Sequence, residues 1–155
     1  MAGLGCNNFG MRVDLEGTRA VVDAALDAGV TLFDTADIYG DKGGSESFLG
    51  EVLEGRRDRV VLATKFGSDM GDGTEARGSR AYIHKAIDAS LQRLRTDVVD
   101  LYQYHTPDNV TPFEETFGAL DELVRAGKVR YVGHSNLDAK QIEEVDSICR
   151  EHGLA

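Results

Sequence analysis

The sequence predicts an α/β fold in which parallel strands alternate with covering helices. Short runs rich in β-branched and aromatic residues, typical of buried strands, are separated by segments with apolar residues at helical spacing. Candidate helix starts lie at residues 14, 45, 79, 111 and 138, so successive starts are 31, 34, 32 and 27 residues apart. This spacing is the size of one strand–helix unit, and the strict alternation predicts a parallel sheet with its helices outside.

The expected strands are short and apolar. A weak candidate covers residues 3–9, and four clearer runs cover residues 31–34, 60–65, 98–104 and 129–133. Valine, leucine and aromatic residues dominate the four clearer runs, as expected for strands that are buried on both faces.

Most of the expected helices have recognisable ends. Asp14 is expected to cap the first helix, and Gly29 is expected to end it. Ser45 and Ser79 are expected to open the next two helices. Residues 111–114, Thr-Pro-Phe-Glu, predict a capping box with proline at the first helical position.

Apolar residues recur on one face of each expected helix, the last of which covers about residues 138–152. These faces predict the part of the core that the helices supply. The expected core residues are Val21, Val22, Ala25 and Leu26; Phe48, Leu49, Val52 and Leu53; Ile83, Ala86, Ile87, Leu91 and Leu94; Phe117, Leu120 and Val124; and Ile142, Val145, Ile148 and Cys149.

Composition and charge exclude several classes of protein. With 17 basic and 27 acidic residues the formal net charge is −10, so the chain lacks the basic surface of a nucleic-acid or anionic-membrane binder. No apolar run approaches the ~20 residues that span a bilayer, and no secretory signal is visible. Cys6 and Cys149 lie far apart without metal-ligand spacing, which indicates reduced thiols in a cytoplasmic protein and no metal site.

The predicted units fit two architectures. Five of them suit either an open doubly wound sheet or part of a closed (β/α)8 barrel, and a complete barrel needs ~250 residues. No linker divides residues 1–155, so we expect one domain. A flavodoxin-like sheet suits the length, but it predicts a glycine-rich phosphate turn after the first strand, and residues 10–13 do not supply one.

Four polar side chains lie at or just after the ends of expected strands. Asp34 and Lys65 end the second and third strands, His105 follows the fourth, and Tyr39 lies in the loop after Asp34. Taken singly, each has a structural interpretation, such as turn capping or aromatic packing. Together they favour a shared site, because the carboxyl ends of parallel strands meet at one edge of a sheet.

This set of groups suits acid catalysis at a carbonyl. A free tyrosine titrates near ~10 and releases its proton reluctantly at neutral pH. An ammonium nearby favours the phenolate, and a carboxylate keeps that ammonium charged and oriented. A histidine can donate a hydrogen bond to the same carbonyl oxygen. The side chains supply a proton but no hydride, so a hydride donor would have to be a cofactor.

Four ordered motifs resemble those of the aldo-keto reductase family. Residues 34–40, Asp-Thr-Ala-Asp-Ile-Tyr-Gly, resemble its D-T-A-x-x-Y-G signature, and residues 63–65 resemble its strand-three lysine motif. Residues 102–108 resemble Y-x-x-H-x-P-D, and residues 127–136 resemble G-K-V-R-x-x-G-x-S-N. Residues 111–115 resemble the corresponding segment in the branch of the family that includes bacterial reductases and potassium-channel β-subunits. The resemblance covers nearly the whole chain.

The resemblance implies a catalytic tetrad of Asp34, Tyr39, Lys65 and His105. Tyr39 would protonate the carbonyl oxygen of an aldehyde, ketone or sugar-like substrate as hydride arrives from NADPH. Lys65, paired with Asp34, would make that proton easier to release, and His105 would orient and polarise the carbonyl.

The resemblance also implies a cofactor-binding set. Ser135 and Asn136 match positions that hold the nicotinamide carboxamide, and Asp34 belongs to this set as well. Cys6 and Asn7 match a turn that touches cofactor and substrate, where the family usually has threonine and tryptophan. No metal is implied.

The same resemblance implies a partial TIM (β/α)8 barrel. The chain would hold about the first five βα units and would lack the N-terminal hairpin and the last three units. Such an open sheet leaves strand edges and the barrel interior uncovered, so we expect self-association, by pairing of two copies or by aggregation.

The alternative is a non-catalytic regulatory subunit that binds nicotinamide, or an inactive truncated fragment. In the channel-associated branch the histidine position is often asparagine, whereas this chain has His105, which favours an enzyme. Cofactor turnover distinguishes the two functions.

Overall fold

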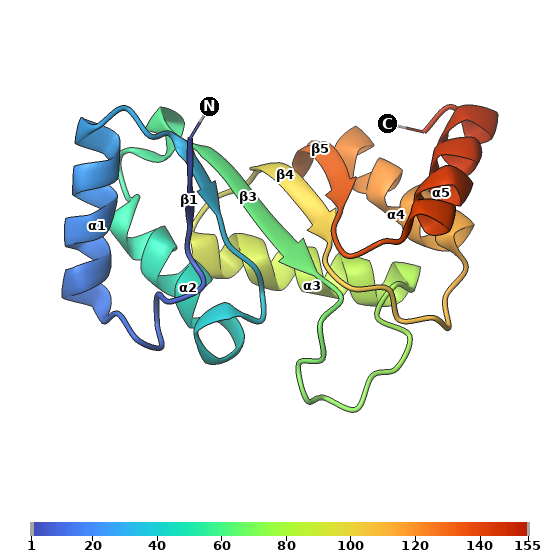
Figure 1. Ribbon diagram of the computed structural model, residues 1–155, viewed down its shortest axis with the longest axis horizontal. Helices are drawn as coiled ribbons and strands as arrows, with labels where there is room; N and C mark the ends of the chain where they lie inside the picture. Colours follow the sequence, from blue (N-terminus) through green and yellow to red (C-terminus); the bar gives the residue numbers. More distant parts are fainter. Residues whose placement is uncertain (1, 155) are drawn as a thin grey trace.

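A computed structural model describes residues 2–154, and Met1 and Ala155 lie outside the described part of the chain. The described residues form a parallel sheet of order β1-β2-β3-β4-β5, in which strands and helices alternate (Figure 1). The strands are β1 (Gly3–Gly5), β2 (Leu32–Asp34), β3 (Val61–Phe66), β4 (Val99–Tyr104) and β5 (Val129–His134). The helices are α1 (Leu15–Asp27), α2 (Tyr39–Val52), α3 (Arg80–Leu94), α4 (Phe113–Arg125) and α5 (Ala139–His152), with a 3-10 turn at Arg57–Arg59.

This architecture confirms the predicted α/β fold with five βα units of a partial (β/α)8 barrel. Every neighbouring pair of strands is parallel, and the strand order follows the chain order without the reversal of a doubly wound sheet. The helices flank the sheet and lie behind it in Figure 1, so that one face of the sheet stays open toward the viewer.

The strand register decides which side chains share the open face. Lys65 pairs with Gln103, and Gln103 pairs with Gly133, so these three residues form one row across β3, β4 and β5. Asp34 on β2 pairs with Ala63, which lies two residues before Lys65 on β3. Because side chains alternate along a strand, Asp34, Lys65 and Gln103 all face the open side.

The opposite face of the sheet and the helices form the core. Fully buried members include Phe33, Leu62 and Phe66 from the sheet and Ile83 and Leu120 from the helices. Phe66 stacks between the rings of the two β4 tyrosines at centroid distances of 4.8 and 5.1 Å.

Two residues that were predicted to lie in the core are exposed. The side chain of Val21 in α1 is 39% exposed and that of Ile142 in α5 is 41% exposed. These helices pack at the two ends of the sheet, where each has one neighbouring helix instead of two. Their apolar stripes are therefore wider than the surface available to cover them.

The first and last helices begin as predicted. Asp14 accepts a hydrogen bond from Gly17 N at the start of α1. Asp138 accepts from Gln141 N, and the Gln141 side chain accepts from Asp138 N, which completes a capping box at α5.

The capping box predicted at residues 111–114 is wrong. Pro112 is the residue that precedes α4, and the Thr111 hydroxyl donates to Asp108 Oδ2 instead of capping the helix. Asp108 also accepts from Gly78 N and from Thr111 N. These hydrogen bonds hold its pKa below the ordinary value even though partial burial acts in the opposite direction. The Thr111 hydroxyl therefore bonds to the carboxylate of Asp108 and not to the first turn of α4.

The two predicted serine starts have different outcomes. Ser79 directly precedes α3, as predicted, but its hydroxyl donates to Ala76 O and makes no capping bond. Ser45 lies inside α2, where its hydroxyl is buried between Cys6 O at 2.7 Å and Thr35 Oγ1 at 2.8 Å. Ser45 therefore ties α2 to the turns after β1 and β2.

A left-handed turn interrupts α2 directly after its first residue, Tyr39. The φ angles of Gly40, Asp41, Lys42 and Gly43 are 69°, 58°, 67° and 114°. A side chain at Gly40 would meet the backbone of Phe9 and Ser45 at 2.4 Å, so glycine is required there by close approach as well as by conformation. The turn separates Tyr39 from the right-handed part of the helix and fixes its place beside the sheet.

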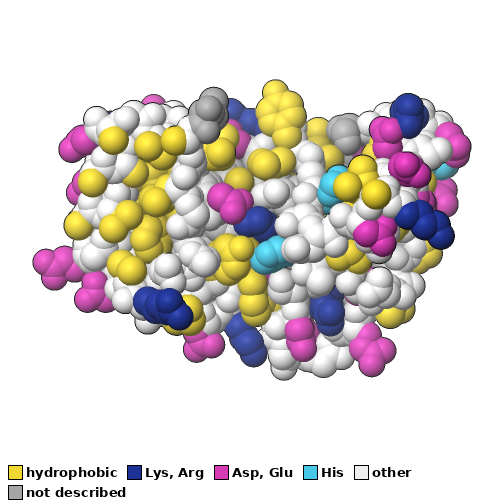
Figure 2. Space-filling model, viewed as in Figure 1, with side chains coloured by type: hydrophobic (Ala, Val, Ile, Leu, Met, Phe, Trp, Pro, Cys, Tyr) yellow, Lys and Arg dark blue, Asp and Glu magenta, His cyan; other side chains and the backbone are white. Residues whose placement is uncertain are grey.

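The open face carries the apolar surface expected of an uncovered barrel interior. Tyr131 and Val61 are 71% and 41% exposed. They lie with Val129, Val98 and Leu101 on a groove of ≈ 970 Å³ toward the amino ends of the strands. Figure 2 shows hydrophobic side chains spread over this face, with acidic, basic and histidine side chains gathered near its centre. No helix within residues 2–154 is long and apolar enough to cross a membrane.

Candidate active site

The carboxyl ends of the strands bring the predicted charged pair together. Lys65 Nζ lies 2.6 Å from Asp34 Oδ2 and 2.9 Å from Thr35 O. The lysine side chain is 7% exposed, whereas that of Asp34 is 40% exposed. A buried ammonium needs a charged or strongly polar partner, and both of these contacts come from the end of β2.

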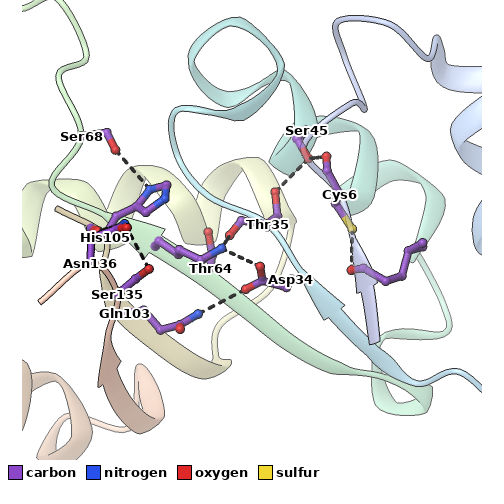
Figure 3. Close-up of polar contacts among 12 residues, drawn as sticks. Cys6, Asp34, Thr35, Ser45, Thr64, Ser68, Gln103, His105, Ser135 and Asn136 are labelled. Carbon is purple, nitrogen blue, oxygen red and sulfur yellow. Dashed lines mark hydrogen bonds and ion pairs between the residues drawn. The ribbon is translucent and has the colours of Figure 1, made fainter. Parts of the chain in front are cut away.

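Gln103 holds the other oxygen of the same carboxylate. Its Nε2 donates to Asp34 Oδ1 at 3.2 Å (Figure 3). Gln103 reaches Asp34 across the intervening strand β3, because both side chains face the open side. Asp34 therefore accepts from Lys65 at one oxygen and from Gln103 at the other, which fixes the orientation of its carboxylate.

Tyr39 lies over this charged pair. The centroid of its ring is 5.1 Å from Lys65 Nζ and 5.6 Å from the centroid of the His105 ring, in an edge-on arrangement. Within residues 2–154 the phenol hydroxyl has no hydrogen-bond partner, so its proton is available to a molecule bound on the open face. The ring therefore lies close to both the ammonium and the imidazole.

His105 follows β4 and is half-buried. Its backbone N donates to Phe66 O at 2.8 Å, which joins the ends of β4 and β3. Burial lowers the pKa of the imidazole, the nearby Lys65 ammonium lowers it further, and Asp34 acts in the opposite direction. Burial and the Lys65 charge therefore both favour the neutral imidazole. Ser68 Oγ lies 3.1 Å from Nδ1 of this ring (Figure 3).

Ser135 and Asn136 follow β5 at the same edge of the sheet. Asn136 Nδ2 donates to His105 O at 2.8 Å and to Ser135 Oγ at 3.2 Å. Its φ is 57°, a left-handed conformation that asparagine tolerates better than most residues. The two side chains are therefore held next to the tetrad, with the amide of Asn136 exposed.

Cys6 and Asn7, which were predicted to touch the cofactor, lie in the turn after β1. The Cys6 side chain is fully buried and its Sγ faces Leu4 O at 3.4 Å. Burial, reinforced by Asp34, raises the pKa of this thiol to about 12. Asn7 is exposed. Of the two side chains, only that of Asn7 is open to a bound molecule.

A buried polar cluster lies behind the site. Glu46 is fully buried and accepts from Thr64 Oγ1 and, at 2.7 Å, from Arg93 Nε. Asp37 is 2% exposed, and its Oδ1 has no hydrogen-bond partner within residues 2–154. Burial, and then the charge of Glu46, raise the pKa of Asp37 to about 7, against the opposing effects of Arg93 and Lys65.

Sequence reasoning missed Gln103 and Ser68, both of which contact the predicted tetrad. A signal for Gln103 was present, because it lies two residues before His105 and so shares its face of the strand. Ser68 lies in the long loop after β3, where no periodicity predicts a side-chain direction. Only the folded loop brings it to His105.

Fold and site together define a barrel-type α/β protein with a cluster of ionisable side chains at the carboxyl ends of its strands. The sequence model of the Aldo/keto reductase family matches residues 2–154. The chain belongs to this family.

Three proteins of Bacillus subtilis are similar to this chain. Aldo-keto reductase YhdN is 42% identical over 136 residues, which are 86% of this chain and 41% of YhdN. Uncharacterized oxidoreductase YqkF is 38% identical over 145 residues, 92% of this chain and 46% of YqkF. Uncharacterized oxidoreductase YrpG is 44% identical over 144 residues, 86% of this chain and 44% of YrpG. The chain thus spans less than half the length of these relatives.

Proposed function

We propose that this protein reduces aldehydes or ketones, including sugar-like carbonyls, to alcohols with hydride from NADPH. The observation that carries the proposal is the position of the Tyr39 ring, 5.1 Å from the Lys65 ammonium and edge-on to His105. A phenol with an available proton, beside a paired ammonium and a neutral imidazole, is suited to protonate a carbonyl oxygen.

Tyr39 is the general acid in this proposal, and it passes its hydroxyl proton to the carbonyl oxygen. The charge of Lys65 stabilises the phenolate that remains. Asp34 keeps the ammonium oriented through its 2.6 Å contact, and Gln103 restrains the carboxylate. The network therefore stabilises charge where it develops during proton transfer.

His105 orients the substrate. A neutral imidazole carries a single ring N–H, which can donate to the carbonyl oxygen and polarise it without competing with Tyr39 as an acid. The half-buried setting that lowers the pKa of His105 supports this role.

The donor set at the end of β5 fits a nicotinamide carboxamide. Both hydrogens of the Asn136 amide are used within the protein, which leaves Oδ1 as an acceptor and the Ser135 hydroxyl as a donor. A carboxamide presents the complementary NH2 and carbonyl groups. Ser135 and Asn136 would hold this group next to His105, with Asn7 and Asp34 also near it. A reduced nicotinamide supplies the hydride when bound.

We expect the protein to act in the cytoplasm and to self-associate through its open face. Self-association is supported by the exposed side chains of Tyr131 and Val61. The outer edges of β1 and β5, which pair with no other strand within residues 2–154, support it as well.

The direct test is turnover of NADPH in the presence of small aldehydes, ketones and open-chain sugars, with the alcohol product identified by mass spectrometry. The proposal predicts that NADPH loss and alcohol formation are equal. Binding of NADPH without any alcohol would contradict reductase activity and would favour a regulatory subunit instead.

A further inference from the structure

The hydrogen bond between Ser68 and His105 links two neighbouring strand ends. Ser68 is the second residue after β3, and His105 is the first residue after β4. Phe66 and Tyr104 are register partners, and His105 N donates to Phe66 O. This backbone geometry holds Ser68 Oγ 3.1 Å from His105 Nδ1.

A neutral imidazole has two tautomers, and a partner at Nδ1 discriminates between them. If Nδ1–H donates to the serine oxygen, Nε2 carries a lone pair and would repel a carbonyl oxygen. If the serine hydroxyl donates to Nδ1, the proton of the ring is on Nε2 and can be donated to a substrate. Within residues 2–154 Nε2 has no hydrogen-bond partner, so it is the ring nitrogen that can reach a substrate.

Ser68 is free to act as the donor. Its hydroxyl makes no other hydrogen bond within the described residues, so no second acceptor competes for its hydrogen. Gly67 and the rest of the loop are braced by Arg77, whose Nε donates to Gly67 O at 2.9 Å and whose guanidinium also donates to Thr74 O. The hydroxyl is therefore presented to the imidazole from a restrained loop.

We propose that Ser68 donates its hydroxyl hydrogen to His105 Nδ1 and thereby holds His105 in the tautomer that carries its proton on Nε2. Ser68 is then a positioning residue that acts through His105. The mechanistic part of this inference rests on the proposed carbonyl reduction, whereas the tautomer itself does not.

Long-range proton–nitrogen NMR spectra of the histidine side chains test the tautomer directly. The His105 signals are assigned by their loss in His105→Gln. In the unaltered protein at neutral pH we expect a protonated Nε2 and an unprotonated Nδ1. Ser68→Ala should move both nitrogen shifts toward the average of the two tautomers, whereas Ser68→Thr, which keeps the hydroxyl, should retain the original pattern. A proton on Nδ1 in the unaltered protein, or an unchanged spectrum in Ser68→Ala, would overturn the proposal.

Kinetics separate this inference from the proposed function. We expect kcat/KM for an aldehyde to fall about fivefold in Ser68→Ala, as expected for one hydrogen bond of about 1 kcal/mol, and to recover in Ser68→Thr. Ser147→Ala, on the exposed face of α5, is the control and should leave kcat/KM unchanged. Absence of turnover in the unaltered protein, together with the expected NMR pattern, would reject the proposed reduction and leave the tautomer assignment standing.

Discussion

Lys65 Nζ and Asp34 Oδ2 lie 2.6 Å apart, with the ammonium buried and the carboxylate partly exposed. The pair is asymmetric, because Lys65 depends on Asp34 and on Thr35 O for the stability of its charge, whereas Asp34 also contacts solvent and Gln103. Asp34 and Thr35 O together therefore hold the charge of Lys65 beside the Tyr39 ring.

Replacing Gln103 should impair turnover without unfolding the protein. In Gln103→Leu the carboxylate of Asp34 loses its second restraint, and we expect kcat to fall about fivefold, as for a net loss of about 1 kcal/mol. The kcat of Gln103→Glu should fall further, because this change brings a like charge beside Asp34. Steady-state kinetics measure the change, and Gln92→Leu on the exposed face of α3 is the control. Equal values for Gln103→Leu and the unaltered protein would show that Lys65 alone orients Asp34.

Asp37 should make stability depend on pH. Its pKa is about 7 in the folded protein and 3.8 ordinarily, so between these values the folded state keeps a proton that the unfolded state has lost. The free energy of unfolding therefore falls as pH rises from about 4 to about 7, and Asp37→Asn removes this fall. We expect Asp37→Asn to be the more stable form at pH 7.5, by a difference on the order of 4 kcal/mol that vanishes near pH 4.

Urea unfolding at a series of pH values measures this difference. Asp72→Asn is the matched control, because hydrogen bonds from Thr74 hold the pKa of this exposed carboxylate below 3.8. Any effect of Asp72→Asn on the free energy of unfolding should be constant from about pH 4 to about pH 7. A pH-independent difference between Asp37→Asn and the unaltered protein would show that Asp37 is charged in the fold throughout this range.

Two glycines in helices should respond to alanine in opposite directions. A methyl group at Gly50 in α2 would lie 2.2 Å from Arg93 O and 2.8 Å from Leu94 C, so the two helices must move apart. We expect Gly50→Ala to lose about 2 kcal/mol or more of unfolding free energy. Gly118 in α4 has nothing within 4 Å of the added carbon, and Gly118→Ala should gain about 0.5–1 kcal/mol from helix propensity. Chemical denaturation measures the unfolding free energies of the two variants. An unchanged stability of Gly50→Ala would mean that α2 and α3 pack less closely than the structure shows.

Much of the fold follows from local sequence. The β-branched runs predicted the last four strands to within one residue at each end, and Asp14 and Asp138 mark helix starts because their carboxylates bond to the first turn. The capping box predicted at Thr111 was wrong because the Thr111 hydroxyl donates to Asp108 in the same loop. The carboxylate of Asp108 is held in place by Gly78 N, which comes from the loop before α3. Such competition between partners depends on the tertiary fold and has no local pattern.

The site was predictable only in part for a related reason. Asp34, Lys65 and His105 end neighbouring strands, and parallel pairing alone brings such residues together. Tyr39 depends on the left-handed turn at Gly40, and Ser68 on a loop braced by Arg77. The roles of all these side chains stay predictions until they are tested by substitution.

The replacement Tyr39→Phe tests the central claim most directly, because it removes a single hydroxyl and keeps the ring that packs against Lys65 and His105. The measurement is the rate of NADPH-dependent aldehyde reduction, with NADPH affinity determined on the same preparation. If Tyr39 is the general acid, the rate should fall roughly 10²–10⁴-fold while NADPH affinity stays nearly unchanged. Equal rates for the variant and the unaltered protein would contradict the assignment of Tyr39 as the proton donor.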